Sequence, residues 1–543
     1  MESAFIVSGK VVDIFNRRIF NAHVYVSNQK ITKIEACDEE FGNYILPGFV
    51  DSHVHIESSM MIPSSFARAA VKHGTVATVS DPHEIANVLG IEGVEFMINN
   101  SKKVPFKFYF GAPSCVPATP FETSGAVISE KEIQKLLENP DIYYLAEMMN
   151  FPGVIHGDKD VLAKLNHATN LNKPIDGHAP GLTGVNLQKY ASKNITTDHE
   201  CTTIEEAIEK INNGMKIQIR EGSAAKDFEN LFPLIDSYPD KIMFCTDDCH
   251  PDDLIKGHIN KTVKRAVEKG ADLFNVLAAT TINPINHYKL NVGLLRIGDP
   301  ADFIVVKDLT EFDVEKTFIN GLLVFENGKV LFPFIDEKPI NRFDCNKISE
   351  NDISVAYNGG KLQIIVAKDG DLITGKSIED PLVKNGLVIS DTARDILKIV
   401  VVNRYFSGTP SVGFIKNFKL RKGAMAGSIA HDSHNIIAIG TNDSDIVVAI
   451  NRLIENKGGI VAFDGREMTD LKLNVAGLMS VEEAEVIAEK YQKVNNMVKE
   501  MGSTLTAPFM TMAFMALLVI PELKIGDKGL FDVSKFEFTS LFV

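Results

Sequence analysis

Short apolar runs alternate with helix-compatible stretches from about residue 46 to residue 285. The apolar runs that predict β-strands include 75–79, 106–110, 143–146, 216–219 and 242–245. Helical spacing of apolar residues predicts helices between them, at 129–138, 159–169, 203–213 and 260–279. Repeated strand–helix units imply parallel strands, and about eight units in about 240 residues fit a closed (β/α)8 TIM-like barrel. An open doubly wound sheet is the alternative, but no Gly-x-Gly-x-x-Gly turn follows a strand here.

The segments on either side of this region have the alternation of short antiparallel strands. Before it, strands are predicted at 4–7, 11–15, 23–26 and 31–34. After it, strands are predicted at 293–295, 301–306 and 317–330. We therefore expect an α/β chain in three parts, with a further α+β domain at the end that has helices near 442–456 and 480–501. The expected boundaries are 1–46 and 288–335 for a small β-sandwich built from both sides of the barrel, 47–287 for the barrel, and 340–543 for the C-terminal domain.

Composition narrows the class of protein. The chain has 543 residues, which is too long for one ordinary domain, and 45% of them are hydrophobic. Its formal net charge is −15 with no long basic run, which argues against nucleic acid as a partner. The six cysteines form no disulfide framework, and Cys245 and Cys249 have the spacing of neither a zinc knuckle nor a redox pair.

Two segments bear on location. The N-terminus, from Met1 to Ala4, lacks the basic and apolar regions of a signal peptide. The apolar segment 507–521 is shorter than the roughly 20 residues of a membrane helix, so a buried core element is the better interpretation. We expect a cytoplasmic protein with no membrane partner.

Candidate metal ligands follow the predicted barrel strands. His53 and His55 lie two residues apart, so they point to the same face of one strand. In a parallel barrel the chemistry lies at the C-terminal ends of the strands, and polar side chains follow four more apolar runs there. These side chains are Glu147, His178, His199 and Asp247. The whole set can ligate two divalent cations about 3.5–4 Å apart, with Glu147 as the bridging ligand.

Each of these residues also has an ordinary structural interpretation. A single histidine at a strand end is more often a loop or capping residue than a ligand. Glu147 alone could be a carboxylate of the barrel interior paired with a basic group, and Asp247 alone could cap the next helix. Six coincidences at successive strand ends are much less probable than one, which favours the metal interpretation.

The other histidines divide into three groups. His83 and Glu84 follow the second strand and face the same mouth, although Asp81-Pro82 could instead begin a simple loop turn. His431 and His434 lie far away, in a polar segment that could equally be a solvated loop. For the remaining histidines considered, a structural interpretation is preferred; they are His23, His73, His156, His167, His258 and His287.

Taken together, these motifs resemble the amidohydrolase superfamily, and within it the adenine deaminase family of bacteria and archaea. The superfamily cues are the 47–55 segment, His178, His199, Thr246-Asp247 and the 298–303 segment. The more specific cues are 55–60, 80–88, 146–150, 176–180, 198–200, 220–223, 246–248, 430–435 and 476–480, so the resemblance covers essentially the whole chain. One departure is Gly427, where a second serine is expected.

The resemblance implies a barrel with a flanking β-sandwich, a binuclear metal centre, and hydrolysis of adenine to hypoxanthine and ammonia in purine salvage. It also implies manganese as the working metal, with iron or zinc as alternatives, and a homo-oligomer such as a dimer. Spacing alone does not name the metal, because a mixed imidazole and carboxylate set suits several ions.

Roles for the side chains near the metals follow from the chemistry that such a reaction needs. Asp247 can take a proton from the attacking water and deliver it to the departing amine. A second acid must protonate ring N1, and the candidates are His83, Glu84, Glu200 and Asp248. His431 and His434 are expected to close over the base.

Three other classes of protein compete with this interpretation. Another amidohydrolase, such as a cyclic-amide hydrolase or a different nucleobase deaminase, could use the same ligands. The zinc deaminases with Pro-Cys-x-x-Cys do not fit, because the sequence has no Cys-x-x-Cys. A non-catalytic barrel scaffold would be expected to have lost some of the six ligands.

Overall fold

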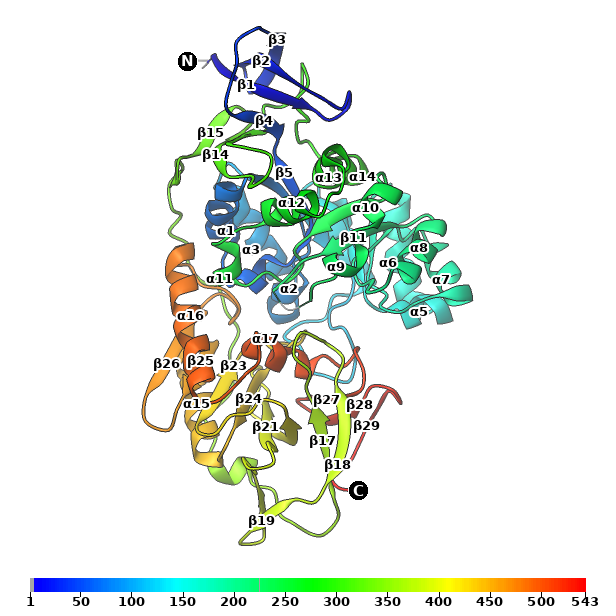
Figure 1. The fold of residues 1–543 in the computed structure, drawn as a ribbon. Helices are drawn as coiled ribbons and strands as arrows, with labels where there is room; N and C mark the ends of the chain where they lie inside the picture. Colours follow the sequence, from blue (N-terminus) through cyan, green and yellow to red (C-terminus); the bar gives the residue numbers. More distant parts are fainter. Residues whose placement is uncertain (1–3, 224) are drawn as a thin grey trace.

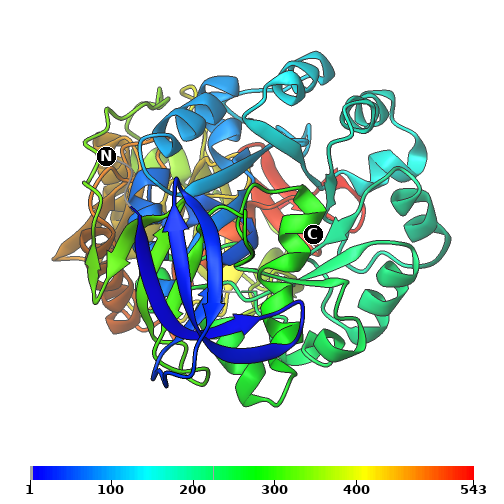
Figure 2. The ribbon, with the colours of Figure 1, turned by 90° about the horizontal axis from the view of Figure 1, so that it is seen from above.

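The computed structural model describes residues 4–223 and 225–543. A small β-sheet lies at one end of the molecule, the barrel in the middle and the C-terminal domain at the other end (Figure 1). Figure 2 views the molecule from the side of the small sheet, with strands β1–β3 in front.

The central part is a closed barrel of parallel strands, as the alternating pattern predicts. Its strands pair in chain order within two sheets; they are β5 (Phe49–Val54), β6 (Thr75–Ser80), β7 (Lys107–Ala112), β8 (Ile142–Met148), β9 (Ile175–Gly177), β10 (Thr197–Asp198), β11 (Lys216–Arg220) and β12 (Ile242–Cys245). The amide of Thr196 donates to the carbonyl of Ile175 over 2.9 Å, which joins the two sheets. At the other seam the amide of Asp247 donates to the carbonyl of His53, also over 2.9 Å, which closes the ring.

Helices follow the barrel strands and cover the outside of the ring. They are α1 (Pro63–Ala70), α2 (His83–Leu89), α3 (Ile91–Ser101), α4 (Glu130–Glu138), α5 (Phe151–His156), α6 (Lys159–Asn170), α7 (Gly184–Ala191), α8 (Ile204–Asn212), α9 (Phe228–Leu231), α10 (Leu234–Ser237), α11 (Pro251–Leu254), α12 (Ile259–Glu268), α13 (Leu273–Ala279) and α14 (Ile282–Tyr288). The single helix predicted at 260–279 is wrong, because the chain forms α12 and α13 there. Gly270 has a φ of 88°, which ends α12, and the Asp272 carboxylate caps α13 by accepting from two backbone amides.

The small sheet combines strands from both sides of the barrel. Its strand order is β16-β15-β14-β13-β4-β1-β2-β3, with β1 (Phe5–Asp13), β2 (Arg18–Ser27), β3 (Lys30–Ala36), β4 (Tyr44–Pro47), β13 (Phe303–Val306), β14 (Val314–Ile319), β15 (Leu322–Glu326) and β16 (Lys329–Val330). The two halves meet where β4 pairs with β13 in antiparallel register, Leu46 opposite Ile304. The rings of Phe5 and Phe318, one from each half, stack 5.5 Å apart, so the halves share a core.

Two strand predictions in this region are wrong. The segment 4–7 and the first part of 11–15 belong to one continuous strand, β1, because Gly9 continues the pairing with Ala22 instead of forming a turn, and residues 14 and 15 lie in the turn that follows. A Cβ on Gly9 would lie 2.9 Å from the Ile45 side chain, so the glycine allows the close approach of that side chain. The segment 293–295 forms no strand, and its Gly293 packs tightly against the carbonyl oxygen of Pro300.

The C-terminal domain has one large mixed sheet with helices on both faces. The strand order of this sheet is β18-β17-β22-β21-β24-β23-β25-β26. The elements of the whole domain are β17 (Leu362–Val366), β18 (Gly375–Glu379), β19 (Leu382–Lys384), β20 (Leu387–Ile389), β21 (Leu397–Val402), β22 (Ser411–Lys416), β23 (Ala424–Gly427), β24 (Ile436–Gly440), α15 (Asp443–Asn456), β25 (Gly459–Phe463), β26 (Met468–Lys472), α16 (Ala484–Glu500), α17 (Pro508–Ala513), β27 (Leu523–Gly526), β28 (Gly529–Asp532) and β29 (Glu537–Phe538). Val400 packs in the same cluster as residues of α15, whereas its neighbour Val401 packs in the cluster that contains residues of α16. This alternation matches the period of a strand covered on both faces.

The apolar segment 507–521 is a buried core element, as expected. It contains α17, whose residues are buried between the sheet and the barrel mouth. In the described part of the chain no helix is both long and apolar enough to cross a membrane.

The C-terminal domain covers the mouth of the barrel. The amide of Ser480 donates to the carbonyl of Met60 over 2.8 Å, and the side chain of Asn435 donates to the carbonyl of Thr123 over 2.9 Å. The strand ends of the barrel therefore face protein from the second domain rather than open solvent (Figure 1).

Candidate metal centre and substrate pocket

The six predicted ligands meet at the mouth of the barrel. Each lies at or just beyond the C-terminal end of a strand, and all six are buried. They are His53 on β5, His55 after it, Glu147 on β8, His178 after β9, His199 after β10 and Asp247 after β12. The parallel barrel brings them together because all its strands end at this face.

Glu147 lies at the centre of the six ligands, and each of its two carboxylate oxygens faces a different pair of histidines. Its Oε1 atom is 3.3 Å from His55 Nε2 and 3.9 Å from His53 Nε2. Its Oε2 atom is 2.6 Å from His178 Nδ1 and 3.3 Å from His199 Nε2. Burial by itself raises the pKa of Glu147, but the imidazoles of His178 and His199 hold that pKa well below its usual value. The carboxylate is therefore ionised, which is the form that can bind a metal.

Asp247 is held from both sides. Its Oδ1 atom is 3.1 Å from His55 Nε2 and 3.4 Å from His53 Nε2. Its Oδ2 atom accepts a hydrogen bond from Arg220 Nη1 over 3.0 Å. Burial raises the pKa of Asp247, but the two histidines and the guanidinium keep it well below its usual value. One oxygen thus faces the ligands while the other is anchored.

Unpartnered imidazole nitrogens indicate what the group can bind. Both ring nitrogens of His53 and the Nδ1 atom of His199 are buried, and they have no hydrogen-bond partner among the described residues. Burying such groups without a partner is unfavourable unless a ligand satisfies them. The Nδ1 atom of His55 lies 3.1 Å from the carbonyl of Asp81, which orients the ring and leaves Nε2 facing the carboxylates. Imidazole and carboxylate donors in this arrangement suit a divalent metal.

His83 and Glu84 begin helix α2, so the simple loop turn considered for Asp81-Pro82 is wrong. His83 Nδ1 lies 3.3 Å from Glu147 Oε1 and 3.0 Å from Asp81 Oδ2. Its other ring nitrogen lies 3.5 Å from Glu84 Oε1. His83 and Glu84 therefore connect Glu147 with the side of the pocket that faces the C-terminal domain.

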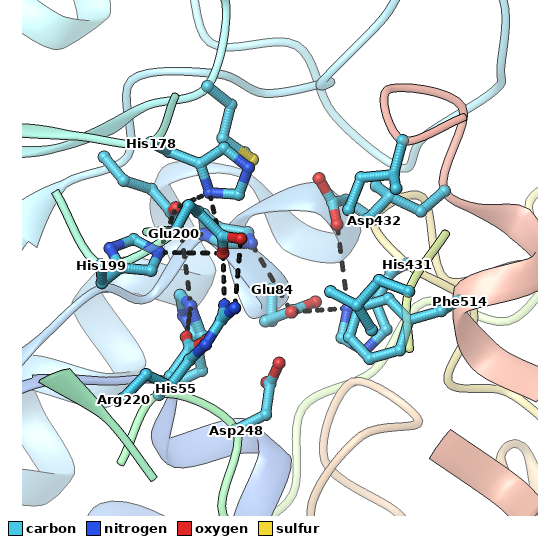
Figure 3. Close-up of a pocket in the computed structure, with 17 residues that line it drawn as sticks. His55, Glu84, His178, His199, Glu200, Arg220, Asp248, His431, Asp432 and Phe514 are labelled. Carbon is cyan, nitrogen blue, oxygen red and sulfur yellow. Dashed lines mark hydrogen bonds and ion pairs between the residues drawn. The ribbon is translucent and has the colours of Figure 1, made fainter. Parts of the chain in front are cut away.

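His431 and His434 are buried against Glu84, so the solvated-loop interpretation of their segment is wrong. His431 Nδ1 lies 2.8 Å from Glu84 Oε1, and His434 contacts the other carboxylate oxygen. Burial lowers the pKa of His431, but Glu84 more than reverses this and raises it to about 9. Burial lowers the pKa of His434 to about 4, so His431 is the cation of the cluster. Figure 3 shows the Glu84 carboxylate beside the His431 ring, with a dashed line between them.

Arg220 belongs to the 220–223 motif of the family resemblance, but the sequence assigns its side chain no chemical role. It ends β11 and its guanidinium contacts Glu200, Asp227 and Asp247, with 3.2 Å from Nη2 to Glu200 and 3.2 Å from Nε to Asp227. Opposite charges on buried groups keep its pKa well above the ordinary value, although burial opposes this. The rule that polar residues at strand ends face the barrel mouth also applies to Arg220, so it was recognisable from that signal.

The remaining predicted residues also line the pocket. Glu200 receives the Arg220 guanidinium, and Asp248 accepts a hydrogen bond from the Ser58 hydroxyl. His250 is a buried histidine that the sequence offers no reason to select; its Nδ1 lies 2.6 Å from the Tyr491 hydroxyl on α16. None of the six histidines given a structural interpretation lines this pocket.

The pocket has a polar side and an apolar side. Carboxylates, imidazoles and Arg220 from the barrel form the polar side. The C-terminal domain supplies what we term the apolar wall: Leu372, Phe514, Leu517 and Ile520. The ring of Phe514 stacks on that of His431 at 4.4 Å with an interplanar angle of 11° (Figure 3). A small, flat, polar-edged molecule fits such a slot.

Comparison with known proteins identifies the family. The model of the Amidohydrolase family matches residues 44–324, and that of the Adenine deaminase C-terminal domain matches residues 371–537. The chain is 56% identical to the adenine deaminase of Methanosarcina mazei over 98% of this chain and 99% of that protein. The chain belongs to the adenine deaminase family of amidohydrolases. The adenine deaminases of Salinibacter ruber and Borreliella burgdorferi are 50% and 51% identical to it, the first over 100% of both chains and the second over 98% of this chain and 99% of that protein. Members of this family thus share both the barrel and the domain that covers its mouth.

Proposed function

We propose that the chain hydrolyses adenine to hypoxanthine and ammonia. The observation that carries the proposal is the composite pocket, in which barrel carboxylates and histidines face an apolar wall from the second domain. Relatives named adenine deaminase match the chain across both parts, so the likeness includes the residues of both sides of the pocket.

We propose that two metal ions bind among the six predicted ligands that surround and include Glu147. His53, His55 and Asp247 would hold one, His178 and His199 the other, and Glu147 would bridge them with its two oxygens. Manganese is the proposed metal, and iron or zinc would fit the same donors. When bound, such ions lower the pKa of water and so supply a nucleophile near neutral pH.

Asp247 is the proposed proton carrier of the reaction. The carbon that bears the amine of adenine is a poor electrophile, and the amine is a poor leaving group, so a proton must move from the water to the amine. Asp247 Oδ1 faces the histidines, where the attacking water would lie, while Arg220 anchors Oδ2. Because Arg220 anchors Oδ2, the carboxylate can accept the proton at Oδ1 without turning away from the histidines.

We assign protonation of ring N1 to the pair His83 and Glu84. Negative charge develops on N1 as water adds, and a nearby acid stabilises it. Within the pair, His83 would donate the proton, because the carboxylates of Asp81 and Glu84 hold its pKa well above the usual value although burial opposes this. Glu84, whose pKa the neighbouring histidines keep well below its usual value despite burial, would hold the His83 ring as the ionised partner. Asp248, Glu200 and His431 line the pocket and would bind the rest of the base, whereas His434 does not line it and would act through its contact with Glu84.

We further propose that the enzyme acts in purine salvage, in the cytoplasm and as a homodimer. These three proposals rest on the likeness to adenine deaminases. Sedimentation of the purified protein tests the dimer, and growth of a deletion strain on adenine as the purine source tests the pathway.

The decisive experiment measures ammonia release by the manganese-loaded protein with adenine, guanine, cytosine and dihydroorotate as separate substrates. We expect turnover of adenine far above the others and close to two metal ions per chain. Asp247→Asn is expected to lose several orders of magnitude in kcat. Equal activity on dihydroorotate would refute the substrate, and full activity of the metal-free protein would refute the metal scheme.

A further inference from the structure

Lys524 is a fully buried lysine that forms no salt bridge among the described residues. It lies on β27, and its Nζ atom donates hydrogen bonds to two backbone carbonyls. One is that of Leu372 over 2.8 Å, and the other is that of Phe514 over 2.9 Å. A lysine seldom lies in a protein interior without a carboxylate, because burial of the charge is costly. This lysine therefore has a specific structural task, which its two acceptors identify.

Both acceptors belong to the apolar wall of the pocket. Leu372 and Phe514 come from segments that are far apart in the sequence, and Lys524 is bonded to both of them. Thr374 adds a parallel connection: its hydroxyl donates to the carbonyl of Leu523 over 2.9 Å and accepts from the amide of Glu522 over 3.0 Å. The strand β27 thus joins the two segments of the wall through these two side chains.

The protonation of Lys524 agrees with its two acceptors. Burial lowers its pKa from 10.5 to about 7. A neutral amine has two N–H bonds, which the two carbonyls satisfy, whereas an ammonium group has a third N–H bond that would need another acceptor. The connection therefore requires the two N–H donors and not the positive charge.

We propose that Lys524 is a positioning residue for substrate binding, which holds Leu372 and Phe514 together and so fixes the apolar wall against which the base would lie. Phe514 in turn stacks on His431, so the same connection fixes the imidazole that faces Glu84. The inference rests on the proposed function, because it names adenine as the occupant of the slot. Lys524 does not touch the pocket itself, and its effect passes through the residues it holds.

The test substitutes Lys524→Met, which keeps the length and apolar volume of the side chain and removes both donors. We expect KM for adenine to rise about tenfold, the equivalent of about one net hydrogen bond, with kcat within about twofold of wild type. Metal content should not change. Lys398→Met is the control, because Lys398 is also fully buried in this domain and donates to a backbone carbonyl, but that carbonyl belongs to Ile353, which is not part of the apolar wall. Lys398 also pairs with Asp443 over 2.6 Å, so its loss tests for a general effect of an altered buried lysine in this domain.

A second variant covers the case in which Lys524→Met does not fold. Thr374→Val removes the parallel connection and keeps the shape of the side chain, so KM should again rise with kcat retained, and Thr374→Ser should restore it. An unchanged KM in the folded variants, or an equal rise in Lys398→Met, would overturn the inference. Wild-type protein that does not deaminate adenine would overturn the proposed function and this inference together, whereas active wild-type protein with unaffected variants would overturn the inference alone.

Discussion

Replacing Arg220 by methionine should weaken catalysis by a calculable amount. The guanidinium anchors Asp247 Oδ2 over 3.0 Å and leaves Oδ1 facing His55 and His53. A hydrogen bond to a charged group contributes about 1.5–3 kcal/mol. Because about 1.4 kcal/mol corresponds to a factor of ten, we expect kcat/KM for adenine to fall about 10- to 150-fold. This is much less than the loss expected for Asp247→Asn, since the carboxylate itself remains.

The assay is the initial rate of ammonia release at several adenine concentrations, with metal content and thermal melting measured on the same preparations. Methionine leaves the carboxylates of Glu200, Asp227 and Asp247 without their cation, so the melting temperature should fall as well. Arg220→Lys keeps the charge and should recover part of both losses. Arg265→Met is the surface control: its side chain is 35% exposed and pairs with Glu221, so kcat/KM should stay within twofold.

One result would refute this reasoning. If Arg220→Met folds, binds its metal and retains kcat/KM within threefold of wild type, the orientation of Asp247 does not depend on the guanidinium. A loss equal to that of Arg265→Met would lead to the same conclusion.

Three further outcomes are expected. Burial lowers the pKa of His431, but Glu84 raises it to about 9. The stability that the protonated His431 contributes is therefore complete below pH about 6.5 and is lost as the pH rises through 9. The difference in Tm between wild type and His431→Phe should shrink over that range. Gly125→Ala should lower Tm by about 2–6 °C, because its Cβ would lie 2.1 Å from the carbonyl oxygen of Val88, whereas Gly42→Ala, in open space, should not. His434→Ala should lower kcat/KM for adenine at least about tenfold, since the residue contacts Glu84, and an unchanged value would remove His434 from the site.

The sequence predicts the barrel side of the pocket well, because the apolar runs mark the strands and the polar residues directly after them mark the barrel mouth. His178 and His199 were recognisable from the apolar runs before them, and the structure brings both to Glu147. The same rule applied to β11 also selects Arg220, which ends that strand. The break between α12 and α13 was harder to see, since Gly270 and Asp272 interrupt an otherwise helical pattern only locally.

The contacts between the domains could not be predicted from local pattern. His431 meets Glu84, and Tyr491 meets His250, although nothing in the spacing of these residues relates one to the other. No local pattern in the sequence distinguishes Lys524 from an ordinary surface lysine, and only the fold shows that it is buried. Such pairs depend on how two folded parts dock, which is a property of the whole chain.

The pairing of β4 with β13 has a consequence for the order of events during synthesis. Tyr44–Pro47 leaves the ribosome early, but its partner Phe303–Val306 follows only after the entire barrel has been made. At roughly 5–20 residues per second, that interval lasts on the order of 13–50 s. Throughout it, one side of β4 is an unpaired strand edge, which is a site for association with other chains. A slowly translated barrel would thus lengthen the period in which nascent chains can aggregate, and fast completion of α14 and β13 would shorten it.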